Sequence, residues 1–115
     1  MDIRRYDIVQ VDLSGAGGSE QGGIRPVLIL QNDIGNTFST TTIVAPFSSR
    51  LKSLNQPTHT LIKKSVDTGL KNDSVLLGEQ IRVISTQRII RKIGTVTDEK
   101  EIESIKRVYL ANFGN

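Results

Sequence analysis

A glycine-rich segment, Ser14–Gly23, separates two apolar stretches near the start of the chain. It holds five of the ten glycines, whose backbone freedom disfavours both helix and strand, so the segment must be a loop. Residues 6–13 before it alternate between apolar and polar side chains, as a half-buried strand does. Residues 25–32 after it contain the run Val-Leu-Ile-Leu, which is typical of a central strand. The loop and its flanks therefore predict two strands joined by a flexible connection.

The rest of the chain continues this β pattern and ends in a helix. Further strands are expected over Thr40–Phe47, Pro57–Lys63 and Asp73–Ile84, followed by a short helical turn over Thr86–Lys92. Thr97 is expected to cap a C-terminal α-helix. The apolar stripe of that helix consists of Ile102, Ile105, Tyr109 and Phe113. Short strands and one terminal helix indicate a single, mainly β domain over residues 1–115, built as a small twisted barrel.

Gly78 lies in the middle of the longest expected strand. Strict alternation would place the Glu79 carboxylate on the same face as Val75, Leu77 and Ile81, which is a poor environment for a charge. A glycine bulge would turn Glu79 outward, toward a surface or a cleft. We therefore expect a bulge at Gly78 and an exposed Glu79.

The composition excludes several kinds of chemistry. The chain has no Cys, so disulfides, zinc–thiolate clusters and a Cys nucleophile are ruled out. Its one His rules out a two-histidine site within one chain. No apolar stretch approaches the ~18 residues needed to cross a membrane, and no leader pattern precedes the first strand. A cytoplasmic protein with no membrane contact is expected.

The chain is basic, and the excess lies in its second half. Residues 1–60 carry five basic and five acidic side chains, whereas the remainder carries ten against seven, which accounts for the net charge of +3. Arg82, Arg88, Arg91 and Lys92 follow one another without an intervening acid. Such a group is able to attract phosphates, but charge alone favours an ordinary solvated face of Lys and Arg. The charge therefore permits nucleic-acid binding without demonstrating it.

Arg25 is the strongest candidate for chemistry. It directly follows the loop and precedes Pro26, which holds it in an extended conformation, as suits a phosphate clamp. Glu20 in the loop can pair with Arg25 or act on a proton, and the hydroxyls of Ser48 and Ser49 end a strand. The alternative is a rim ion pair between Glu20 and Arg25 and a simple turn at the two serines. The residues alone leave both interpretations open.

Two other candidates are weaker. The glycine-rich loop lacks the Gly-Lys-Ser/Thr sequence and following helix of a P-loop, so it is either a mobile lid over a groove or only a flexible connection. His59 is an acid/base candidate by residue type, but no carboxylate stands near it in the sequence. We expect His59 to be a surface residue or a hydrogen-bonded strand residue.

Several stretches together resemble the MazF/PemK family of toxin endoribonucleases from type II toxin–antitoxin systems. The segment Gly18–Asn36, GSEQGGIRPVLILQNDIGN, is the closest to the family signature. The resemblance continues through residues 7–14, 42–49, 56–59 and 71–82, and so covers nearly the whole chain.

The resemblance implies an SH3-like barrel of the CcdB/PemK type that forms a homodimer, with RNA running along the interface. It implies sequence-specific cleavage of single-stranded mRNA in the cytoplasm, without a metal or other cofactor. The implied reaction is attack of the ribose 2′-oxygen on the adjacent phosphate, leaving 2′,3′-cyclic phosphate and 5′-hydroxyl ends. It also implies a cognate antitoxin protein that occupies the RNA groove and displaces the glycine-rich loop.

The same resemblance assigns the site residues. Arg25 would stabilise the charge of the phosphorane, Glu20 would act as base or orient Arg25, and Ser48 would supply a hydroxyl. The branch that this chain most resembles usually has Thr in place of Ser48, so the hydroxyl is kept while the stiff χ1 of a β-branched side chain is lost. The residues implied to bind RNA are Asn32, Pro57, Ser74, Glu79 and Gln80.

Two other functions stay open. One is a non-catalytic toxin of the same barrel that inhibits DNA gyrase, and the other is an RNA- or peptide-binding module without activity. Arg25 together with Ser48 favours the enzyme, because a gyrase inhibitor would depend on residues of the C-terminal helix and would leave RNA intact.

Overall fold

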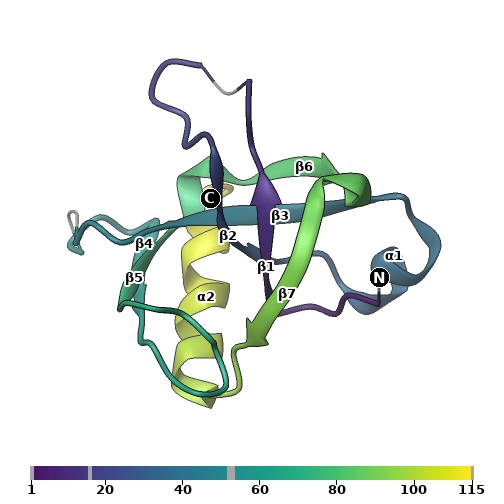
Figure 1. Ribbon diagram of the computed structural model, residues 1–115. Coiled ribbons are helices and arrows are strands. Elements are labelled where there is room, and N and C mark those ends of the chain that lie inside the picture. The colour runs from purple at the N-terminus through teal and green to yellow at the C-terminus, as the bar shows by residue number, and fades with distance from the viewer. Residues whose placement is uncertain (1, 16, 52–53, 115) are drawn as a thin grey trace.

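The computed structural model describes residues 2–15, 17–51 and 54–114, and the predicted mainly β fold is confirmed (Figure 1). The described elements comprise seven strands, two α-helices and two 3₁₀ helices. In chain order they are β1 (Asp7–Asp12), β2 (Ile24–Ile29), α1 (Asp33–Phe38), β3 (Thr41–Ser48), β4 (His59–Ile62), β5 (Ser74–Leu77), η1 (Gly78–Gln80), β6 (Arg82–Ser85), η2 (Thr86–Arg88), β7 (Ile89–Thr95) and α2 (Glu99–Ala111).

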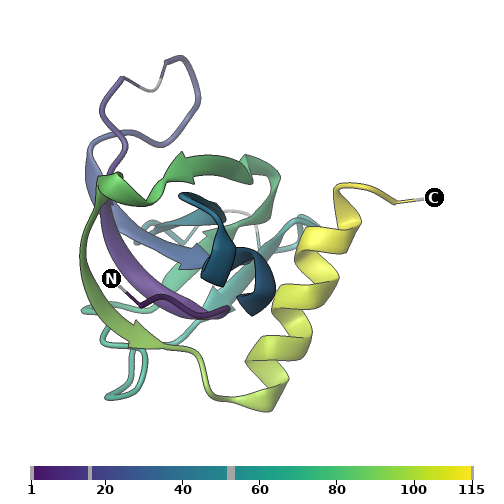
Figure 2. The ribbon, with the colours of Figure 1, turned by 90° about the vertical axis from the view of Figure 1, so that its right-hand side faces the viewer.

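The strands form one antiparallel sheet in the order β4-β5-β3-β2-β1-β7, and β6 pairs with β3 beside this path. Figure 2 shows that the sheet is strongly curled, with α2 along one side. Within the described residues, the end strands β4 and β7 do not pair with each other. The predicted barrel is therefore an open, strongly curled sheet.

Two hydrophobic clusters of described residues fill the two faces of the central strands. Ile8 packs in the cluster beneath α2, with Phe47 and Ile105, whereas its neighbour Val9 packs in the other cluster. Both Ile8 and Val9 are fully buried. The first strand was expected to be half-buried, but curling of the sheet covers both of its faces.

The long strand expected over Asp73–Ile84 is broken. β5 ends at Leu77, the 3₁₀ helix η1 follows, and β6 begins at Arg82. A bulge at Gly78 was therefore the wrong mechanism, although Glu79 is exposed as expected. Packing requires a glycine at this position, because a Cβ on Gly78 would stand 2.2 Å from Cγ1 of Val108 and 2.7 Å from the carbonyl oxygen of Thr58.

The local structure differs from the expectation in two places. The helical turn expected over Thr86–Lys92 is confined to η2, because β7 begins at Ile89 and its backbone pairs with β1. The helix α1 was missed, since its six residues are too few to show a helical period. The side chain of Asn32 begins α1 by accepting a hydrogen bond from the backbone N–H of Gly35 at 2.9 Å.

The C-terminal helix is present, with two corrections. Asp98 caps it, accepting from the N–H groups of Lys100 and Glu101, whereas Thr97 donates to a carboxylate oxygen of Asp67 at 2.8 Å. Ile102, Ile105 and Tyr109 face the core as predicted, but Phe113 lies beyond the helix and is 74% exposed. No helix in the described part of the chain is long and apolar enough to span a membrane.

Candidate active site

The glycine-rich segment projects from the sheet as a loop between β1 and β2 (Figure 1), and Arg25 lies at its base. The Arg25 Nε donates to the carbonyl oxygen of Gly22 at 2.8 Å, and its Nη1 donates to that of Phe47 at 3.1 Å. Partial burial lowers the pKa of the guanidinium below its ordinary value. Two carbonyls from separate segments of the chain thus hold a partly desolvated cation in one orientation.

Ser48 reaches the same place from β3. It follows Phe47, whose carbonyl binds Arg25, and its side chain is buried with Oγ accepting from the N–H of Arg50 at 3.2 Å. A cavity of about 290 Å³ is lined by Gln21, Arg25, Ser48, Ser49 and Arg50. The structure therefore brings Arg25 and Ser48 together, and it adds Gln21 and Arg50, which sequence analysis did not assign.

Glu20 takes no part in this cluster. Its side chain is exposed, and its backbone N–H donates to the carbonyl of Gly17 at 3.1 Å. Among the described residues there is no hydrogen bond or ion pair between Glu20 and Arg25, so the expected pair is not formed. The Arg25 donors are directed to backbone carbonyls instead. A role for Glu20 in proton transfer remains a prediction.

A second cavity, of about 310 Å³, adjoins the first and shares Arg25 and Ser49 with it. Ser74 lines this second cavity, and its buried hydroxyl donates to the carbonyl of Asn72 at 2.8 Å. One of the residues implied to bind RNA therefore lies beside Arg25, although the two are far apart in sequence.

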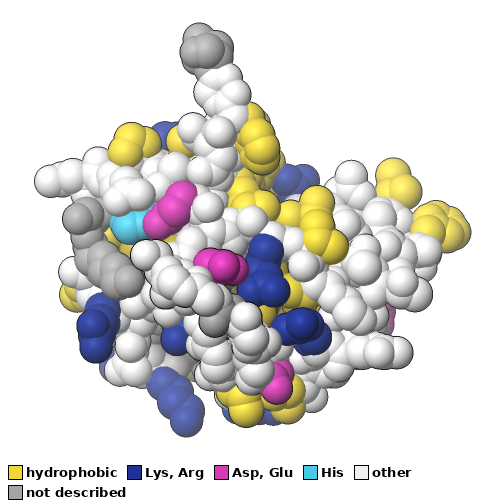
Figure 3. Space-filling view, turned by 90° about the horizontal axis from the view of Figure 1, so that it is seen from above, with side chains coloured by type: hydrophobic (Ala, Val, Ile, Leu, Met, Phe, Trp, Pro, Cys, Tyr) yellow, Lys and Arg dark blue, Asp and Glu magenta, His cyan; other side chains and the backbone are white. Residues whose placement is uncertain are grey.

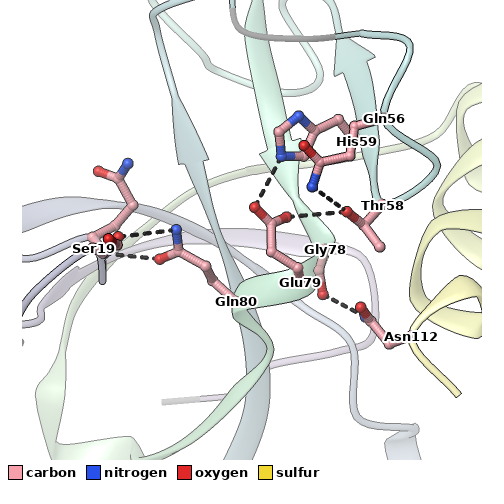
Figure 4. Close-up of polar contacts among 9 residues, drawn as sticks. Ser19, Gln56, Thr58, His59, Gly78, Glu79, Gln80 and Asn112 are labelled. Carbon is pink, nitrogen blue, oxygen red and sulfur yellow. Dashed lines mark hydrogen bonds and ion pairs between the residues drawn. The ribbon is translucent and has the colours of Figure 1, made fainter.

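Glu79 and His59 form a pair at the surface near η1. His59 Nε2 lies 3.0 Å from a carboxylate oxygen of Glu79, and the Thr58 hydroxyl donates to the other oxygen at 3.4 Å (Figure 4). From above, the single His is visible beside an acidic side chain (Figure 3). No carboxylate stands near His59 in the sequence; the pairing of β4 with β5 brings Glu79 to it. The expectation that it is a hydrogen-bonded strand residue is confirmed.

Gln80 connects η1 to the glycine-rich loop. Its side-chain oxygen accepts from the backbone N–H of Gln21 at 2.8 Å, and its amide donates to the Ser19 carbonyl at 3.4 Å (Figure 4). Gln80 therefore anchors the loop at whose base Arg25 lies. Pro57 is exposed just before β4, on the side of Thr58 and Glu79.

Asn32 is not near this cluster within one chain. It follows β2 at the end opposite Arg25, and the strand from Arg25 to Ile29 alone spans about 13 Å. Its side-chain oxygen is occupied by the α1 cap. The structure thus gathers Arg25, Ser48, Ser74 and Gln80 around the loop base, and separates Asn32 from them.

The basic residues of the second half do not form one patch. Lys92 pairs with Asp7 at 3.2 Å, and Arg88 donates to the carbonyl of Asp12 at 3.2 Å. Within the part of the chain that the structure describes, Arg91 alone of this group lines a cavity with Arg25. Among the described residues, no three side chains of the His, Asp and Glu types gather closely enough to hold a metal ion.

The fold is shared with solved structures of toxins. A crystal structure of MazF from Deinococcus radiodurans superimposes with a TM-score of 0.81 at 17% identity, over 100% of this chain and 99% of that one. An endoribonuclease in complex with its cognate antitoxin from Mycobacterial species gives a TM-score of 0.78 at 17% identity, over 97% and 95%. At these identities the likeness concerns the fold alone.

The chain belongs to the PemK-like, MazF-like toxins of type II toxin–antitoxin systems, whose family model matches residues 4–111. It is 48% identical to Endoribonuclease EndoA of Bacillus subtilis over 86% of this chain and 84% of the relative. It is also 48% identical to Endoribonuclease MazF of Staphylococcus saprophyticus, over 85% and 81%. The resemblance drawn from the sequence motifs is confirmed.

Proposed function

We propose that this toxin, an endoribonuclease like the relatives at 48% identity, cleaves single-stranded mRNA at specific sequences without a metal ion or other cofactor. The observation that carries the proposal is the meeting of the Arg25 guanidinium and the Ser48 hydroxyl in one cavity beneath the glycine-rich loop. A fixed cation beside a buried hydroxyl suits stabilisation of a phosphorane. The chain has no Cys, and the side chains that line this cavity are arginine, serine and glutamine, so the proposal assigns the chemistry there to Arg25 and Ser48.

The proposed reaction is an internal transfer. The ribose 2′-oxygen bonds to the adjacent phosphorus and loses its proton, while the bond from phosphorus to the 5′-oxygen breaks and that oxygen gains a proton. The products carry a 2′,3′-cyclic phosphate and a 5′-hydroxyl. Arg25 neutralises charge on the non-bridging oxygens, and its lowered pKa eases a proton donation to the leaving oxygen. Ser48 hydrogen-bonds the same phosphate, and Glu20 accepts the 2′-proton when the loop closes.

We propose that Ser74, Glu79, Gln80 and Pro57 contact bases of the same strand. Amide and carboxylate groups are able to address the Watson–Crick edges of unstacked bases.

Asn32 lies far from Arg25 on one chain, which supports a groove completed by a second protomer. Among the described strands β6 pairs with β3 alone, and its Val83 is 59% exposed, so its other edge offers a surface for that homodimer. In this proposal the toxin acts in the cytoplasm and a cognate antitoxin protein covers the groove.

The test is cleavage of mixed-sequence single-stranded RNA in EDTA by the protein, by Arg25→Ala and by Arg107→Ala as a matched control. Arg107 is exposed on α2, away from the site. We expect cleavage by the protein and the control, and a rate lower by about 100-fold or more for Arg25→Ala. Absence of cleavage by the intact protein, or equal rates for Arg25→Ala, overturns the proposal. Gyrase inhibition with intact RNA would establish the alternative toxin.

A further inference from the structure

The second cavity extends from Arg25 to side chains of β1 and β7. Its lining includes Lys71 and Asn72 from the connection between β4 and β5, and Arg91 from β7. Arg91 is held beside it by a hydrogen bond from Nε to the side-chain oxygen of Gln10 at 3.1 Å. Three cations from three separate parts of the chain thus converge on one cavity, namely Arg25, Lys71 and Arg91.

Among the described residues, no acidic side chain lines this cavity. Two other cavities with basic side chains in their linings do contain acidic residues. The cavity beside Lys63 and Lys64 also contains Asp67, Asp98 and Glu101, and the one beside Arg88 contains Asp12. Uncompensated cations in a concave surface concentrate an attractive field for anions. The charge of the second cavity is therefore suited to phosphate.

The cavity also suits a base. Apolar side chains of Phe47, Leu70 and Ile93 form part of its wall, and the amides of Gln10 and Asn72 offer hydrogen bonds. At about 310 Å³ it lies at the small end of the range for ligand sites, which starts near ~300 Å³. Its size and its mixture of apolar and amide groups match a single nucleoside.

We propose that this cavity is a nucleotide subsite for the RNA strand, next to the scissile phosphate, in which Lys71 and Arg91 bind the flanking backbone phosphate. The proposal deepens the function proposed above and rests on it. Arg25 belongs to both cavities, so a strand whose scissile phosphate is at Arg25 passes directly into this subsite. Lys71 and Arg91 position the strand, whereas Arg25 and Ser48 act on the reacting atoms.

Binding and cleavage are measured separately. Binding uses mixed-sequence single-stranded RNA with 2′-O-methyl groups, which blocks the attacking oxygen, and follows fluorescence anisotropy between 50 and 200 mM salt. The variant is Lys71→Ala with Arg91→Ala; the control is Lys106→Ala with Arg107→Ala, which removes equal charge from exposed positions of α2. Loss of contact with the one flanking phosphate reduces the salt slope by about 0.7, so the variant loses ~2.6-fold less affinity over this range than the protein does.

Cleavage of unmodified RNA supplies the second readout. We expect the variant to raise KM with little change in kcat, because its residues hold the strand without touching the reacting atoms. A salt slope and KM equal to those of the control overturn the subsite. A loss of kcat alone also overturns it, since that places the residues in the chemistry. If the binding result is as expected but the intact protein cleaves no RNA, the subsite stands and the proposed endonuclease mechanism fails.

Discussion

The imidazole of His59 lies 3.0 Å from the carboxylate of Glu79, although 20 residues separate them in the sequence. The antiparallel pairing of β4 and β5 aligns His59 with Leu77, two residues before Glu79. The His59 side chain is 5% exposed and that of Glu79 is 36% exposed. A buried ring therefore holds an accessible carboxylate in place at the edge of the site.

We expect this contact to be measurable as a coupling between the two residues. In a double-mutant cycle with His59→Ala and Glu79→Ala, the free energies of unfolding should deviate from additivity by about 0.5–1.5 kcal/mol. The control cycle pairs His59→Ala with Glu103→Ala, an exposed acid on α2, and should be additive. Urea denaturation measures all of these values. Additivity in the first cycle would mean that the pair does not stabilise the fold.

Ser48→Ala should lower the cleavage rate by at least about tenfold, because the hydroxyl beside Arg25 is lost. Dimerisation and the far-UV circular dichroism spectrum should not change. Ser49→Ala is the matched control, since Ser49 is an exposed serine that lines the same cavity. Ser48→Thr should be neutral or faster, as the β-branch restricts χ1. If Ser48→Ala leaves the cleavage rate unchanged, Ser48 has only a structural role in the turn and takes no part in the reaction.

Gly78→Ala should destabilise the protein by about 1–3 kcal/mol, because the added Cβ meets Val108 and a backbone carbonyl. Val108→Ala removes one of these clashes, so the double variant should lose less than the sum of the single losses. Gly17→Ala is the control, because a Cβ added to Gly17 would meet no described atom within 4 Å. Thermal denaturation provides the comparison. Equal stability of Gly78→Ala and Gly17→Ala would show that α2 moves freely away from η1.

The substitution Ser14→Ala should lower the stability of the folded protein at neutral pH but not in strong acid. The side chain and then the backbone N–H of Ser14 donate to the carboxylate of Asp12 and lower its pKa below 3.8. A lowered folded pKa stabilises the fold above the unfolded value and loses that effect as pH falls through the folded value. The difference in Tm should therefore be constant above about pH 5 and vanish toward pH 2. A difference that grows in acid would contradict this assignment.

Local sequence patterns were sufficient to predict part of the fold and part of the candidate site. Arg25 between a glycine-rich loop and Pro26 already indicated a rigidly held cation, and Ser48 at the end of an apolar run indicated a hydroxyl at a strand end. Strand β7 was missed because its hydrogen bonds are made with β1, more than seventy residues away along the chain. The break at Gly78 was misread for a similar reason, since the group that requires a glycine there is Val108 of α2.

The sequence by itself determined the β class, the loop, the terminal helix and the identity of the catalytic candidates, because these depend on residue type, short-range periodicity and family motifs. Only the tertiary structure decided which side chains meet. The pairing of His59 with Glu79, the separation of Glu20 from Arg25, and the convergence of Lys71 and Arg91 on the Arg25 cavity depend on strand register and packing. Strand register and packing depend on contacts between residues that are distant in the sequence. A local sequence pattern does not report the energies of such contacts.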